Sequence, residues 1–168
     1  FIKEILSKNI HGLQMMICGS YRRKKPESGD IDILLYHNRL DETPNYLTVF
    51  INLLVSNKFI TDSLTNVDNS TKYMGFCKFK DNPVRRIDIR FISYNSYASA
   101  LLYFTGSGDF NKNMRTYALK KGYTINEYGI YKLKDQTDKN GKKKKVKGFK
   151  LKAVTEEDIF NFLDLDYI

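Results

Sequence analysis

The sequence has only two cysteines among its 168 residues, Cys18 and Cys77, and neither lies in a CxxC pair or at a metal-site spacing. This scarcity argues against a disulfide-built secreted scaffold and predicts buried thiols in a reducing compartment. The sequence also lacks any apolar run near the ~18 residues that a membrane helix needs, so we expect no membrane contact. The chain opens at Phe1 inside a predicted helix, so we expect a fragment of a longer protein.

The composition supports a folded, nucleic-acid-binding protein. Hydrophobic residues make up 42% and aromatic residues 14% of the chain, which is enough for a core. Lysine and arginine number 28 against 19 acids, so the net charge is 28 − 19 = +9. A balance this basic favours a polyanionic partner, nucleic acid first, although a merely soluble basic protein is the alternative.

Hydrophobic periodicity and turn residues predict alternating helices and short strands, with a break near residues 93–96. Thr43 is a candidate helix N-cap with Pro44 after it, and Thr155 with Asp158 resembles a capping box. Predicted helices cover 1–9, 43–57, 96–104, 110–121 and the segment after Thr155. Predicted strands cover 15–18, 31–36, 73–80, 84–92, 123–125 and 128–133, with turns at 81–83 and 138–141.

A run of four lysines, Lys142–Lys145, follows the second of these turns. A solvated loop is the simpler interpretation of the run. Phosphate contact or nuclear targeting is the alternative.

Three aspartates on two predicted strands form the most informative pattern. Asp30 and Asp32 share one face of the strand 31–36, and Asp88 shares a face of the strand 84–92 with two arginines. Carboxylates are the ligands that hard divalent ions prefer, and three of them can hold two ions for an in-line displacement. The alternative is that they are surface acids paired with arginines, but crowded like charges in a strand are costly without a cation.

The segment before these acids suggests a phosphate site. A predicted strand ends at Gly19 and Ser20, and a polar loop runs on to Gly29. Glycine lets the backbone approach a phosphate closely, and Ser20 adds a hydroxyl donor.

These segments, read together, resemble the active-site signature of family X DNA polymerases. The resemblance rests on residues 19–23 with 27–35, on 85–90 around Asp88, and on the Tyr-Phe-Thr-Gly-Ser turn at 103–107. It continues through 110–115, 123–128 and 157–160, so it follows nearly the whole chain in order. It implies an α+β fold, with a palm of mixed sheet and flanking helices over 1–94 and a small α/β thumb over 95–168.

The resemblance also implies a role for each matched residue. Asp30, Asp32 and Asp88 would be the catalytic, metal-binding acids. The triphosphate would be held by Gly19, Ser20, Arg23, Ser28 and Gly29. The sugar and base of the nucleotide would be met by Tyr103, Phe104, Gly106 and Asn111. The DNA would be contacted by Arg86, Arg90, Lys112 and Arg115.

The implied reaction is template-directed addition of a deoxynucleotide to a primer 3′-hydroxyl, with release of pyrophosphate, as in short-gap repair. The implied cofactors are two Mg²⁺ ions, for which Mn²⁺ would substitute, and the implied partner is primer–template or gapped DNA. We expect a monomer acting in the nucleus or at a viral replication site. Gly108 departs from the pattern, since relatives closest to the beta enzyme carry an acid there.

Two other functions stay open at this point. One is a template-independent terminal transferase or another nucleotidyltransferase. The other is a DNA-end-binding module without catalysis, against which the three intact aspartates argue.

Overall fold

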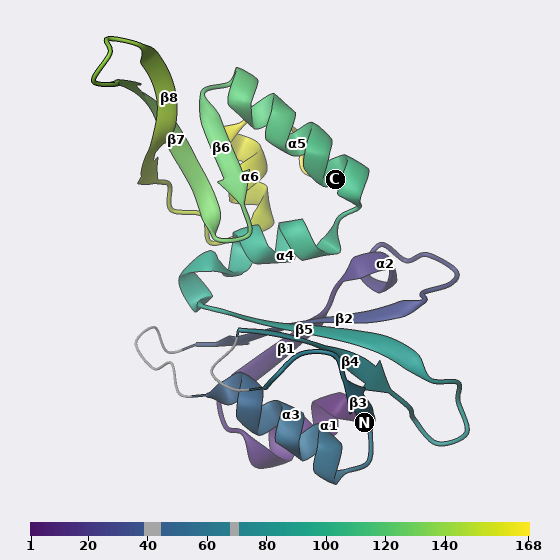
Figure 1. The fold of residues 1–168 in the computed structure, drawn as a ribbon. Helices are drawn as coiled ribbons and strands as arrows, with labels where there is room; N and C mark the ends of the chain where they lie inside the picture. Colours follow the sequence, from purple (N-terminus) through teal and green to yellow (C-terminus); the bar gives the residue numbers. More distant parts are fainter. Residues whose placement is uncertain (39–44, 68–70) are drawn as a thin grey trace. The chain divides into compact units, whose positions relative to one another are not determined.

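The computed structural model describes residues 1–38, 45–67 and 71–168 of the chain. The chain forms two compact units, Phe1–Tyr94 and Asn95–Ile168. Each unit has its own sheet and its own hydrophobic core (Figure 1). No helix in the described ranges is long and apolar enough to cross a membrane.

The first unit is built on a mixed five-stranded sheet with the strand order β1-β2-β5-β4-β3. β2 and β5 pair in parallel, and the other neighbours pair antiparallel. The strands are β1 (Leu13–Ile17), β2 (Asp30–His37), β3 (Ile60–Ser63), β4 (Lys72–Cys77) and β5 (Arg85–Ile92). The helices are α1 (Ile2–Asn9), the short α2 (Gly19–Arg22) and α3 (Tyr46–Ser56).

The core of this unit fixes the direction of the polar side chains. Ile87 and Ile89 of β5 are fully buried, together with Phe50 and Leu54 of α3. α1 and α3 lie on this side of the sheet (Figure 1). Because side chains alternate along a strand, the residues between the core positions point to the other face. Those residues are Asp30, Asp32 and Leu34 on β2 and Arg86, Asp88 and Arg90 on β5.

The second unit has a three-stranded antiparallel sheet in the order β6-β7-β8. Its strands are β6 (Tyr123–Asn126), β7 (Gly129–Thr137) and β8 (Lys143–Lys150). Its helices are α4 (Tyr97–Thr105), α5 (Gly108–Lys120) and α6 (Glu156–Phe162), and a 3₁₀ turn, Tyr94–Ser96, precedes α4. Ala118, Ile130 and Ile159 are fully buried in its core.

The predicted cap of the last helix is confirmed. The Thr155 hydroxyl accepts a hydrogen bond from the Asp158 amide at 3.2 Å, and the Asp158 carboxylate accepts one from the Thr155 amide at 2.9 Å. These reciprocal bonds satisfy two amides that the helix itself leaves without partners. They also lower the pKa of Asp158 below its usual value, because backbone amides stabilise its charged form.

The lysine run does not form a loop. Asp138 closes the turn by accepting hydrogen bonds from the amides of Asn140 and Lys142, both at 2.9 Å. Its own amide donates to the Lys142 carbonyl at 3.0 Å, so the chain reverses direction here. Lys143–Lys145 therefore continue as part of β8, paired with β7, and the interpretation as a solvated loop was wrong.

Other element boundaries also differ from the prediction. The chain forms one helical turn, α2, at Gly19, where a loop was expected, because amides at 22 and 23 bond back to carbonyls at 18 and 19. β4 ends at Cys77, three residues before the predicted end, and α5 begins at Gly108 because Ser107 caps it. The predicted helix start at Thr43 and Pro44 lies outside the described residues. α3 begins at Tyr46, with Asn45 at the N-cap position.

Both cysteines are buried thiols outside any disulfide, as predicted. Burial raises the pKa of Cys77 to about 11, from a usual value of 9.0, since its thiolate would lose solvation. The contribution of the neutral Cys77 thiol to the stability of the folded state is fully present below pH 9.0 and is lost as the pH rises through about 11.

We expect iodoacetamide at pH 8 to leave Cys18 and Cys77 unmodified in the folded chain and to modify both in denaturant. The reason is that the reagent attacks an accessible thiolate, both thiols are buried, and the pKa of Cys77 is raised as well. Mass spectrometry of the alkylated protein measures this directly. A Ser7→Cys variant, whose new thiol is exposed, is the positive control. Rapid native modification of Cys77 would contradict its burial.

Candidate active site

The pairing of β2 with β5 places the three predicted acids on one face of the sheet. Asp32 lies directly beside Asp88 in the parallel register, and Asp30 lies beside Arg86. Neighbouring residues in register point to the same face, so all four side chains share it. Asp30 is exposed, whereas Asp32 and Asp88 are partly buried.

The electrostatic environment of Asp32 shows that these acids affect one another. Burial raises the pKa of Asp32 above its usual value, and the negative charges of Asp88 and Asp30 raise it further. Arg23 and Arg86 act in the opposite direction. A positive charge brought to this face would therefore stabilise the charged form of Asp32.

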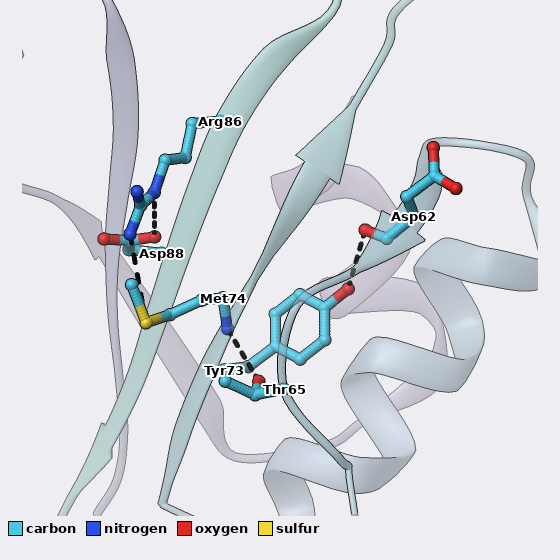
Figure 2. Close-up of polar contacts among 6 residues, drawn as sticks. All are labelled: Asp62, Thr65, Tyr73, Met74, Arg86 and Asp88. Atoms are coloured by element: carbon cyan, nitrogen blue, oxygen red, sulfur yellow. Dashed lines mark hydrogen bonds and ion pairs between the residues drawn. The ribbon is translucent and has the colours of Figure 1, made fainter.

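Arg86 supplies positive charge beside Asp88. Its Nε donates to the Asp88 carboxylate at 3.2 Å, and its Nη2 lies 3.9 Å from the sulfur of Met74 on β4 (Figure 2). The side chain of Asp88 is 26% exposed, so the pair is reachable from solvent. The pairing of an acid with an arginine, which the sequence left open as an alternative, is therefore present between Arg86 and Asp88.

The three acids are not arranged as a complete metal-binding cluster. Within residues 1–38, 45–67 and 71–168, no three His, Cys, Asp or Glu side chains are grouped closely enough to hold a metal ion. The shared sheet face and the oxygen donors nevertheless suit a hard divalent ion. The donor set thus fits such an ion chemically, with Asp30, Asp32 and Asp88 as the residues that would hold it.

The expected triphosphate-binding residues come from α2 and the loop that leads into β2. The hydroxyls of Ser20 and Ser28 are hydrogen-bonded to each other, and Ser28 also donates to the Asp30 carbonyl at 3.1 Å. The Arg85 guanidinium donates to the Ser28 carbonyl, which ties this loop to the start of β5. Sequence reasoning missed Arg85, because nothing in the sequence pairs it with a loop 57 residues away.

Gly19 connects this segment to the acids. It has a φ of +58°, and a Cβ placed there would lie 2.0 Å from the Asp32 carboxylate. The Cys18 amide also donates to the Asp32 carbonyl at 2.8 Å. Only glycine permits both the backbone conformation and the close approach.

The predicted sugar and base contacts lie in the second unit. Asn111 donates from its side-chain amide to the Tyr103 carbonyl at 2.8 Å, which fixes α5 against the end of α4. The rings of Tyr103 and Phe104 meet edge to face at 5.1 Å. The peptide between Gly106 and Ser107 is cis. A small pocket here is lined by Ser99, Leu102, Tyr103, Asn111, Met114, Arg115 and Ile125.

The remaining predicted DNA-binding residues belong to different units, Arg90 to the first and Lys112 and Arg115 to the second. Lys112 is exposed on α5 and Arg90 is partly buried on β5. Gly108 opens α5 with no atom within 4 Å of an added Cβ, and Asp109 follows it as an exposed residue of the first turn. Apart from the residues next to it in the chain, no described side chain lies within 4 Å of a Cβ added at Gly108.

We expect Gly19→Ala to destabilise the first unit by about 1–2 kcal/mol, because the Cβ of alanine is sterically strained at a positive φ. Displacement of Asp32 by the new methyl group adds to this. Gly29→Ala is the matched control, since an added Cβ there meets nothing within 4 Å. Urea unfolding of the two variants measures the difference, and equal stabilities would refute the close approach of Gly19 to Asp32.

Comparison with known proteins gives matches along the whole chain. Residues 1–94 match the family described as DNA polymerase beta palm, and residues 100–168 match DNA polymerase beta thumb. The chain is 35% identical over 162 residues to DNA polymerase lambda of Rattus norvegicus, covering 93% of this chain and 28% of that protein. It is 26% identical over 176 residues to DNA polymerase lambda of Arabidopsis thaliana, covering 99% and 33%.

A third relative carries a different name. DNA nucleotidylexotransferase of Xenopus laevis is 28% identical over 202 residues, covering 99% of this chain and 38% of that protein. The chain thus spans about a third of the length of these relatives. The α+β fold class predicted from the sequence is confirmed, with palm and thumb regions in order. The chain belongs to the DNA polymerase beta family, family X of the DNA polymerases.

Proposed function

We propose that this chain is the palm and thumb of a template-directed DNA polymerase that fills short gaps in DNA repair. The observation that carries the proposal is the parallel register that sets Asp32 beside Asp88, with Asp30 on the same face. Membership of family X, whose enzymes use divalent metal ions, supports it. The reaction is attack of a primer 3′-oxygen on the α-phosphate of a deoxynucleotide, releasing pyrophosphate.

The three acids would hold two Mg²⁺ ions, for which Mn²⁺ would substitute. Bound ions would offset the negative charge of the triphosphate and of the transition state. Asp32 supports this role, because the two neighbouring acids already disfavour its charged form. Asp88 would also favour loss of the proton from the primer hydroxyl, and it is accessible enough to do so.

The nucleotide contacts that the family resemblance implies form two separate sets, one in each unit. Ser20 and Ser28, joined by their hydroxyls, would present donors to the triphosphate beside Arg23 and Gly29. Tyr103, Phe104 and Gly106 would lie against the sugar and base. Asn111 would meet the base edge with its second N–H or its amide oxygen, since the bond to the Tyr103 carbonyl uses only one of its donors.

The proposed DNA contacts are arginine and lysine side chains, Arg86 and Arg90 in the first unit and Lys112 and Arg115 in the second. Arg86 would bind the phosphate at the primer end, exchanging its bond to Asp88 for one to the DNA. Arg90, Lys112 and Arg115 would contact the duplex. We propose a monomer that works where DNA is repaired or replicated, in the nucleus or at a viral replication site.

We expect Asp88→Ala to abolish magnesium-dependent primer extension, a loss of roughly 10³-fold or more, while the fold stays intact. Asp88→Asn is the matched variant, because it keeps the shape and the bond from Arg86 but removes the charge. Both should fail in a gapped-duplex extension assay. Extension at the unsubstituted rate by either one would remove Asp88 from the catalytic set.

A template-independent terminal transferase is the second candidate function. The likeness to DNA nucleotidylexotransferase favours it, since that relative covers 99% of this chain. The two candidates differ in how they choose the base, so one assay separates them.

We expect extension of a one-nucleotide gap only with the nucleotide complementary to the template, and no extension of single-stranded DNA. Each of the four nucleotides is tested in turn on both substrates. Extension of the single strand would instead support the terminal transferase. Nucleotide affinity that Mg²⁺ fails to increase, measured with no DNA present, would support a non-catalytic end-binding module.

A further inference from the structure

The positive charge of the chain is concentrated in one hairpin, β7–β8. Residues 129–150 contain nine lysines and two aspartates, a net charge of 9 − 2 = +7 out of the +9 of the whole chain. The remaining 146 residues carry only 9 − 7 = +2. The catalytic function proposed above assigns no role to any of these lysines.

The strand register sorts six of these lysines into two sets of three, one on each face. Lys143, Lys145 and Lys147 lie opposite Thr137, Asp135 and Leu133 and therefore share one face. Lys144 lies opposite Gln136, and β7 alternates through Lys134 to Lys132 on that second face. All six lysines are exposed.

The hairpin stands away from the core of the second unit. Beyond Leu133, the residues of β7 are exposed on both faces, and in Figure 1 the tip of the hairpin extends past β6. β8 is the edge strand of its sheet, so its outer side pairs with no other described strand. A hairpin buried against the unit would instead show one apolar face.

The base and the tip of the hairpin are both held in place. Lys150 donates to the Asn95 carbonyl and to the Ser96 hydroxyl, both at 3.2 Å, so this lysine anchors the base. Lys147 lies over the Tyr131 ring at 4.3 Å, and Asp138 closes the tip. The lysines are therefore displayed on a pre-formed scaffold, which lowers the entropic cost of binding.

We propose that β7–β8 is a second DNA-binding element, which enters a groove of duplex DNA and directs one lysine face toward each phosphate backbone. A sheet with its side chains is about 10 Å thick, judged from the spacing of stacked sheets. The major groove is about 12 Å wide and admits a two-stranded ribbon. Two opposed lysine faces match two phosphate walls, and lysine contacts to phosphate are independent of base sequence.

This inference rests on the proposed function only in taking DNA as the partner, so its test avoids catalysis. The probe is a duplex closed by loops at both ends, which has no primer terminus, in EDTA and without nucleotides. The fluorescence anisotropy of the labelled duplex, titrated with the whole chain, gives the dissociation constant at several salt concentrations. Asp88→Ala should bind this probe like the unsubstituted chain or more tightly, because it removes a negative charge, whatever its effect on extension.

Two triple variants test the two faces, Lys143→Gln/Lys145→Gln/Lys147→Gln and Lys132→Gln/Lys134→Gln/Lys144→Gln. Each should weaken binding by roughly tenfold to a hundredfold near 0.1 M salt, and reduce the magnitude of the salt slope by about 3. Lys58→Gln/Lys78→Gln/Lys80→Gln in the first unit removes the same charge at exposed positions and is the matched control. Circular dichroism melting of all three variants checks that each remains folded.

The result expected is a loss with both hairpin triples that clearly exceeds the loss with the control. An equal loss with the control would mean that only net charge matters, and would overturn the proposal. A loss confined to one hairpin triple would contradict the two-sided seating. Displacement of the duplex by polyglutamate at equal charge concentration would assign the hairpin to an acidic protein instead.

Discussion

The parallel pairing of β2 with β5 determines nearly everything that the first unit can do. Parallel strands need a long connection, and here 47 residues, from 38 to 84, separate the end of one strand from the start of the other. The sheet brings the two strands together because Ile33 and Leu35 of β2 and Ile87 and Ile89 of β5 are buried in the same core. The same register then sets Asp32 beside Asp88, an arrangement that no local preference of either segment would produce. Packing on one face thereby accumulates negative charge on the other.

That charge is costly to the folded chain by itself. The carboxylate of Asp32 is partly buried and lies near two other acids, and both effects raise its pKa. Arg86 reduces the repulsion by bonding to Asp88, and Gly19 lets the backbone come against Asp32. A site of this kind lowers the stability of the folded chain and raises its affinity for cations and their phosphate ligands. The destabilised acids and the glycine beside them are thus parts of one arrangement.

The sequence predicted the acids better than it predicted their surroundings. Alternation along β2 and β5 is a local property, so the common face of Asp30 and Asp32 and the place of Asp88 between two arginines could be inferred from each segment alone. That the two strands pair and bring Asp88 onto the same face depends on packing between distant segments. The bond between Arg85 and the Ser28 carbonyl, and the bond between Asn111 and the Tyr103 carbonyl, depend on how distant segments pack. β8 was missed because lysine is depleted in strands, and a strand with two exposed faces lacks the apolar alternation that marks one. The turn at Asp138, which was predicted, is what converts the lysine run into a strand.

The edge position of β8 has a consequence for solubility. An unprotected edge strand offers a row of backbone donors and acceptors to any other extended chain, and pairing of two such edges begins aggregation. Any other strand that paired with the free edge of β8 would lie beside Lys143, Lys145 and Lys147. If that strand were the β8 of a second copy, lysines would lie opposite lysines, and like charges directly opposite each other are destabilising. The lysines therefore act as a barrier to self-association, which lets the hairpin remain extended in solution without polymerising.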